Sequence, residues 1–138
     1  MMRRILFVLA LGAFAFSTTP AARADGERAL GPDAVLLTGN DLAVALTGVT
    51  AEGWSFDGEG WFYFTEYYAP DGSIVGSGGP DEGSDAWDWE GHWRTESEQA
   101  CYEYPALDKE ACRQIYVENG VYKNVTDGEV RAYWQPTE

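Results

Sequence analysis

The alternation of apolar and polar residues along the chain is clearest between residues 87 and 94. Every second position there is an indole or a glycine, and the positions between them carry a charge or the imidazole. The two sets are Trp87, Trp89, Gly91 and Trp93 on one parity, and Asp88, Glu90, His92 and Arg94 on the other. Successive side chains of a β-strand point to opposite faces, so this period of two predicts a strand with one apolar and one wet face.

A second strand is predicted over residues 61–68, where aromatic residues with high β-propensity are concentrated. Pro70-Asp71-Gly72 follows as a turn, and residues 73–76 are expected to return as the hairpin partner. The stretch 76–85 is rich in Gly, Asp, Ser and Pro, which predicts a flexible loop.

Shorter strands are predicted over the remaining chain, with hairpin turns at Asn119-Gly120 and Asp127-Gly128. They cover residues 100–104, 113–117, 121–125 and 129–134. One helix is predicted to begin at Thr38, which can cap it, and to end at Gly48. We therefore expect a mainly β fold in a single domain over residues 38–138. Its form is an antiparallel sheet curled as a small, partly open or lipocalin-like barrel with one short N-terminal helix.

The N-terminal residues have the order of a cleavable bacterial signal peptide. Two arginines precede an apolar run over residues 5–16, and Ala22-Arg23-Ala24 supplies the small residues read by signal peptidase. The apolar run is shorter than the ~20 residues that span a bilayer, so a membrane anchor is the less favoured alternative. We expect removal of residues 1–24, an extended leader over residues 25–37, and a periplasmic or secreted protein.

Acidic residues strongly outnumber basic ones. The sequence carries Lys+Arg 9 and Asp+Glu 23, and the predicted signal peptide holds three of the arginines and no acid, which leaves a net charge of −17 on the rest. Nucleic acid and anionic lipid are disfavoured as partners because phosphate contacts require a basic face. A basic protein is compatible with this charge, which also favours solubility. We expect a monomer that does not insert into the membrane.

Cys101 and Cys112 are the two cysteines of the chain. An even pair in an oxidising compartment predicts a disulfide, which here would join two neighbouring strands. Two cysteines and one histidine are too few for a typical structural zinc site, and the acidic stretch 81–90 lacks the calcium-loop motif. No metal and no cofactor is therefore expected.

Several short motifs of the chain together resemble those of a known family. They are residues 37–42, the turn 68–72, Gly91-His92-Trp93-Arg94, Cys101 with Cys112, Gly120-Val121-Tyr122 and the ending 130–134. Over residues 36–134 the chain resembles small exported alphaproteobacterial proteins classed as a domain of unknown function. The resemblance implies a compact β-rich, lipocalin-like domain with no catalytic residue to carry over, because such motifs report fold more than activity.

Two groups of side chains are candidates for function. Asp88, Glu90 and His92 share the wet face of one predicted strand, at a spacing that can serve acid–base hydrolysis, although a solvated sheet face is the alternative. The aromatic residues can line a pocket for a sugar or another flat ligand, or they can form the core of a small sheet. The candidate binding residues are Trp61, Tyr63, Trp87, Trp89, Trp93 and His92.

We therefore expect an exported binding protein that is not an enzyme. Its ligand is either a small molecule or a basic protein, and in the second case the protein would act as an inhibitor. Two alternatives remain open: a periplasmic hydrolase that uses Asp88, Glu90 and His92, and a structural component of the envelope.

Overall fold

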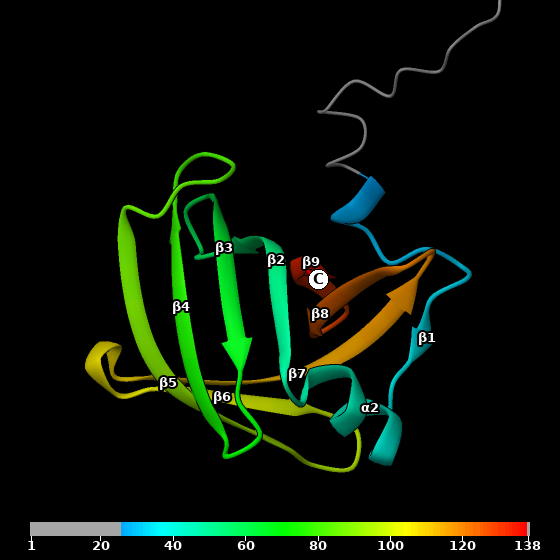
Figure 1. The fold of residues 1–138 in the computed structure, drawn as a ribbon. Helices are drawn as coiled ribbons and strands as arrows, with labels where there is room; N and C mark the ends of the chain where they lie inside the picture. Colours follow the sequence, from blue (N-terminus) through cyan, green and yellow to red (C-terminus); the bar gives the residue numbers. More distant parts are fainter. Residues whose placement is uncertain (1–25, 138) are drawn as a thin grey trace, which may run out of the picture.

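Eight antiparallel strands close into a barrel in the computed structural model, which describes residues 26–137 (Figure 1). The predicted signal peptide, residues 1–24, lies outside the described residues. The elements are β1 (Val35–Leu36), α2 (Gly39–Leu46), β2 (Val49–Phe56), β3 (Trp61–Tyr68), β4 (Ser73–Gly79), β5 (Trp87–Thr95), β6 (Ala100–Tyr104), the 3-10 turn η1 (Pro105–Leu107), β7 (Lys109–Glu118), β8 (Val121–Thr126) and β9 (Glu129–Thr137). The mainly β fold with one short helix is confirmed, and the barrel is closed rather than partly open.

The barrel wall follows the order of the sequence. Each strand from β2 to β9 pairs with the next, and β9 pairs with β2 to close the ring. The two hairpin turns predicted at Asn119-Gly120 and Asp127-Gly128 have positive φ at all four residues, between 51° and 78°. Such turns match the right-handed twist of the strands they join, which is why these dipeptides suit them. The short strand β1 pairs with Tyr116 and Val117 of β7, beyond the β7 residues that pair with β6.

Two strands differ from their prediction for the same physical reason. β4 continues to Gly79, so the predicted loop 76–85 began too early, and β2 was not predicted at all. Neighbouring strands approach their inward glycines too closely to leave room for a side chain. A Cβ on Gly76 would meet the Trp89 ring, and one on Gly53 would meet the β9 backbone at Tyr133 and Trp134. Inward positions without apolar side chains give a weak strand signal.

Helix α2 lies at the lower end of the barrel in Figure 1. Leu42 and Leu46 are fully buried and belong to the same core as Tyr68 and Ile74 at the ends of β3 and β4. The helix therefore closes this end of the barrel. Thr38 stands at its N-cap as predicted, but its side chain makes no capping hydrogen bond.

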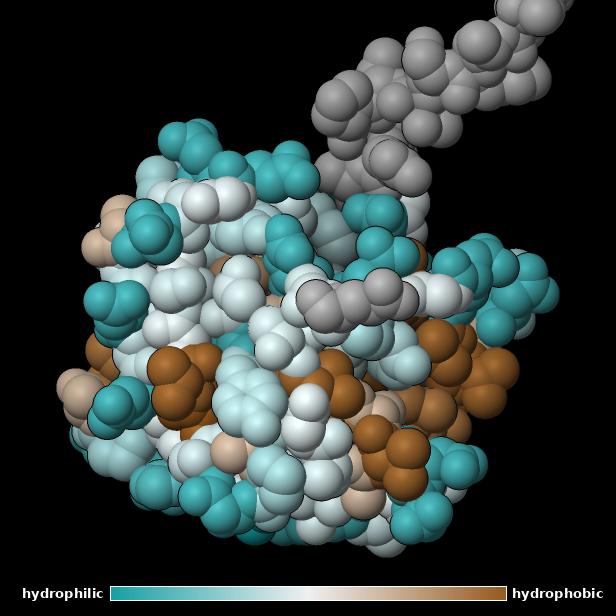
Figure 2. All heavy atoms as spheres, viewed as in Figure 1, coloured by the Kyte–Doolittle hydropathy of each residue, from teal (hydrophilic) through white to brown (hydrophobic). Residues whose placement is uncertain are grey.

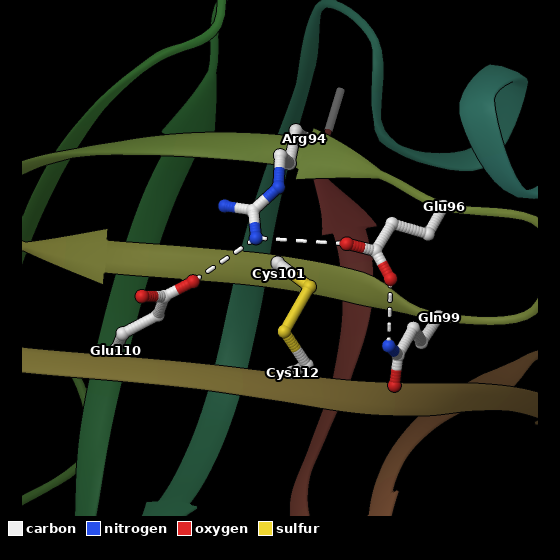
Figure 3. Close-up of a disulfide and its surroundings, with 6 residues drawn as sticks. All are labelled: Arg94, Glu96, Gln99, Cys101, Glu110 and Cys112. Carbon is white, nitrogen blue, oxygen red and sulfur yellow. Dashed lines mark hydrogen bonds and ion pairs between the residues drawn. A yellow bond between two sulfur atoms is a disulfide. The ribbon is translucent and has the colours of Figure 1, made fainter.

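The predicted disulfide is present and joins directly opposed residues of β6 and β7 (Figure 3). Arg94 of β5 lies beside it, with its guanidinium 3.0 Å from a carboxylate oxygen of Glu110 and 3.6 Å from one of Glu96. The cross-link lies on the outer side of the wall, because the neighbouring residues Ala100 and Tyr102 face the core. A disulfide indicates an oxidising, extracytoplasmic compartment.

Replacing both cysteines with alanine is expected to lower the free energy of unfolding by about 2–3 kcal/mol, because the unfolded chain regains the entropy of a short loop. Urea denaturation of the oxidised protein and the double variant measures the difference. Arg94→Ala is the control, since exposed ion pairs contribute little to stability. Equal unfolding midpoints for the oxidised protein and the cysteine variant would contradict a stabilising cross-link.

Candidate functional site

The side chains predicted to bind a ligand lie on two sides of the barrel wall. Trp89 and Trp93 point inward and pack against the core, and Trp87 shares their face at the start of β5 with 49% of its surface exposed. Trp61 and Tyr63 lie on the outer face of β3, opposite in parity to the core residues of that strand. His92 lies exposed on the outer face of β5. The structure therefore does not bring these six residues into one site.

The buried carboxylate of Glu66 is the centre of a hydrogen-bond network inside the barrel. One oxygen accepts a bond from the Tyr68 hydroxyl at 3.0 Å. The other accepts bonds from the Trp89 indole at 2.9 Å and the Tyr104 hydroxyl at 2.8 Å. Glu66 is the one charged residue on the inward parity of the stretch 62–68, and that pattern was the sequence signal for this network.

The Trp89 indole reaches Glu66 by lying across two glycines of β4. A Cβ on Gly76 would meet the indole nitrogen that donates to Glu66, and a Cβ on Gly78 would meet the far end of the same ring. Gly76 pairs directly with both Trp89 and Glu66 across the sheet. The glycines therefore make room for an aromatic hydrogen-bond donor in the interior.

A second network fills another part of the barrel interior. The Trp134 indole donates to the Asn124 side-chain oxygen at 2.9 Å, and the Asn124 amide lies 3.3 Å from the Tyr102 hydroxyl. Tyr122 stacks on Trp134 with ring centroids 4.5 Å apart. Trp134, Asn124 and Tyr102 are all buried. An eight-stranded barrel is just wide enough to be filled by side chains, and here aromatic rings fill it.

The outer face of the wall carries a row of aromatic residues across neighbouring strands. Tyr63, Trp54 and Tyr133 are direct cross-strand partners on β3, β2 and β9, and Lys123 of β8 continues the row. The Trp54 and Tyr63 rings meet edge to face at 5.8 Å. Tyr63 and Tyr133 are each only 6% exposed although they face away from the barrel interior, so this part of the outer wall is covered.

Residues 26–31, which we call the strap, form the cover together with the loop that holds Glu82. The described part of the predicted extended leader is therefore packed on the barrel, and residues 26–27 are helical rather than extended. Lys123 holds the strap through bonds to the carbonyl oxygens of Ala29 at 2.7 Å and Gly26 at 3.3 Å. Its ammonium also pairs with Glu118 at 2.8 Å, and Glu118 accepts a bond from the backbone N–H of Gly31.

Two cavities lie along this wall, and together we call them the outer groove. The larger has a volume of about 1000 Å³ and the smaller about 450 Å³. Residues lining the larger one include Glu27, Arg28, Glu52, Trp54, Tyr63, Glu82, Glu118, Lys123 and Tyr133. Residues lining the smaller one include Arg28, Leu30, Phe56, Trp61, Glu129 and Arg131. Arg28 lines both cavities and therefore lies between them.

The exposed apolar surface elsewhere is divided into small areas. Figure 2 shows separate hydrophobic patches among hydrophilic residues on the face in view. The large exposed hydrophobic side chains come from distant parts of the chain, among them Val35, Val44, Val75 and Leu107. Scattered apolar residues of this kind are normal on a protein surface, so the outer groove is the stronger candidate for a binding site.

The phenols of the outer groove stay protonated near neutral pH. Burial raises the pKa of Tyr63, and the hydrogen bond from its hydroxyl to Glu52 raises this pKa further. Burial also raises the pKa of Tyr133, which the nearby Arg28 partly offsets. Both groups are therefore neutral hydrogen-bond donors beside carboxylates.

Asp88, Glu90 and His92 lie exposed on the outer face of β5, as the alternation predicted, and none of them lines either cavity. A hydrolase that uses them stays a prediction. Among residues 26–137, no group of three or more His, Cys, Asp or Glu side chains is placed to hold a metal ion. In the same range no helix has the length and apolar character needed to cross a membrane.

Comparison with known proteins identifies no relative: no family model, no curated protein and no solved structure matches the chain. The resemblance to exported proteins of unknown function is therefore supported only at the level of the fold, an antiparallel β-barrel. Membership of that family stays a prediction.

Tyr104→Phe is expected to lower the free energy of unfolding by about 1.5–3 kcal/mol, because it removes a hydrogen bond to a buried carboxylate. Tyr122→Phe is the matched control, since that ring is held by stacking on Trp134. Urea denaturation compares the two variants. Equal effects would show that the bond to Glu66 contributes nothing beyond ring packing.

The stability of the barrel is expected to depend on pH through Glu66. Burial raises the pKa of this carboxyl above its usual value of 4.5, and its three hydrogen bonds offset only part of the rise. The folded state then holds the proton more tightly than the unfolded chain. The free energy of unfolding should therefore fall as pH rises from 4.5 through the raised pKa.

Comparing the wild type with Glu66→Gln by urea denaturation over that pH range isolates this contribution, because the remaining carboxyls are common to both proteins. The wild type should lose more stability with rising pH than the variant does. Parallel pH profiles would show that Glu66 does not titrate differently in the folded and unfolded states.

Proposed function

We propose that the chain is a non-catalytic binding protein of the periplasm or the cell exterior, and that its ligand occupies the outer groove. The observation that carries this proposal is the aromatic row of Tyr63, Trp54 and Tyr133 beneath a cavity of about 1000 Å³. Ligand sites are typically concave, lined by aromatic rings with a few polar groups, and of this order of volume.

The barrel interior is a weaker candidate for the same role. Its rings are joined to one another and to Glu66 by hydrogen bonds, so a ligand would have to displace buried and satisfied partners. The outer groove has aromatic surface beside cavity space, together with neutral phenols and carboxylates that can orient a ligand. The disulfide supports the proposed compartment, since such bonds persist where the environment is oxidising.

Fluorine NMR of protein labelled with 5-fluorotryptophan tests the position of the site. The probes are methyl glucoside, indole and butylguanidinium, which represent a sugar, a flat aromatic molecule and a cation. We expect at least one of them to shift the resonances of Trp54 and Trp61, assigned from single Trp→Phe variants. The resonances of the inward Trp89 and Trp93 should not move.

Titration of the Trp54→Phe and Trp61→Phe variants with the same probe provides the control, and both should bind it more weakly. The proposal fails if no probe moves either outer resonance. It also fails if the probe moves Trp89 and Trp93 instead, because that result would place the site inside the barrel.

A further inference from the structure

Arg28 lies in the outer groove where a cationic group of a ligand would fit. We propose that the groove binds an extended basic segment of a partner protein, and that an arginine of this segment replaces Arg28 over the Trp61 ring. This inference rests on the proposed function, because it names the partner class for the same groove. In the absence of the partner, the strap occupies the partner's position in the groove.

The position of Arg28 shows that a guanidinium group fits over the aromatic surface of the outer groove. Its guanidinium carbon lies 4.5 Å from the centre of the Trp61 ring, which is a cation–π contact. Its Nε is buried and has no hydrogen-bond partner among the described residues. The Trp61 ring face and the Tyr133 hydroxyl, whose pKa the guanidinium lowers, therefore place Arg28. Because Arg28 separates the two cavities, its departure would join them into one continuous groove.

The charges around the groove favour a basic occupant. Four glutamates and two cations line the larger cavity, and one of the cations, Lys123, is already paired with Glu118. If the strap leaves with Arg28, Glu52 and Glu82 remain beside an aromatic surface that has lost this charge. The predicted mature chain carries −17 in total, which attracts a basic partner at long range.

The strap also shows how a main chain can be held there. Lys123 donates to two of its carbonyl oxygens, and Glu118 accepts from the backbone N–H of Gly31. Lys123 is only 4% exposed, so removal of the strap would leave a largely buried ammonium with lost partners. A partner main chain can restore these bonds. Arginine suits the ring better than lysine, because its planar guanidinium stacks on aromatic faces.

Competition between the strap and the partner has a measurable consequence. A ligand that binds only when the strap has left shows an affinity reduced by the fraction of molecules in that open state. Arg28→Ala weakens the closed state by removing a cation–π contact worth about two- to thirtyfold in an equilibrium constant. The variant should therefore bind a basic peptide more tightly than the wild type does, by a factor in this range.

The test uses a capped peptide that alternates alanine and arginine, with citrulline in place of every arginine in the control peptide. Isothermal titration gives the dissociation constants for the full mature chain and for Arg28→Ala. We expect the arginine peptide to bind both proteins, the alanine variant more tightly, and the citrulline peptide to bind neither. Affinity for the arginine peptide should fall as salt is raised.

Glu82→Gln and Glu90→Gln form a matched pair, because each removes one exposed carboxylate and only Glu82 lines the groove. Glu82→Gln should lower the affinity of the protein for the arginine peptide more than Glu90→Gln does. Equal losses of affinity would show that the peptide is attracted to the overall negative charge, and would contradict binding in the outer groove. Weaker binding by Arg28→Ala, or equal binding of the citrulline peptide, would contradict the proposal that an arginine of the partner replaces Arg28.

The two proposals can fail separately. If the neutral probes shift Trp54 and Trp61 while the arginine peptide binds neither protein, the groove is a binding site but the basic partner is wrong. If no probe and no peptide perturbs these residues, both proposals are wrong.

Discussion

The burial of the Glu66 carboxylate determines how the interior of this barrel is built. A charge removed from water requires hydrogen-bond donors, and three aromatic side chains from β3, β5 and β6 supply them. To reach the carboxylate, the Trp89 ring needs the space over Gly76 and Gly78. Leu42 and Leu46 of α2 close one end of the same core. Because the interior is filled by these contacts, we place the proposed ligand on the outer wall.

The wall is therefore aromatic on both faces, and the two faces differ in how their rings are held. Inside, Trp89 and Trp134 donate to buried oxygens of Glu66 and Asn124. Outside, Trp54 and Trp61 border cavities and are covered by a segment that attaches through a few polar contacts. Departure of this cover would break the Lys123 bonds and the Arg28–Trp61 contact, so the proposed exchange requires a partner that restores similar contacts.

The sequence predicts most of the strands and an antiparallel barrel, because alternation and turn dipeptides are local signals, but it does not predict that the barrel is fully closed. The strand around Trp87–Thr95 and the turn at Asp127-Gly128 are examples. It does not reveal which face of residues 61–68 lies inside, since both parities are aromatic there. Inward glycines interrupt the apolar alternation of β2 and β4, because the β9 backbone or the Trp89 ring fills the space of a side chain there. The outer groove is missed because it needs the strap to fold back onto strands far along the chain.

The seam of the barrel is the β2–β9 ladder, the one place in its wall where strands distant in the sequence meet. All other junctions in the ring are hairpins between consecutive strands. The pair of Trp54 and Tyr133 lies across this seam, on the floor of the outer groove. A ligand that contacts both rings would hold β2 and β9 together, and so would stabilise the pairing that closes the barrel. If the proposed ligand binds only the closed barrel, its binding free energy adds to the stability of the ring.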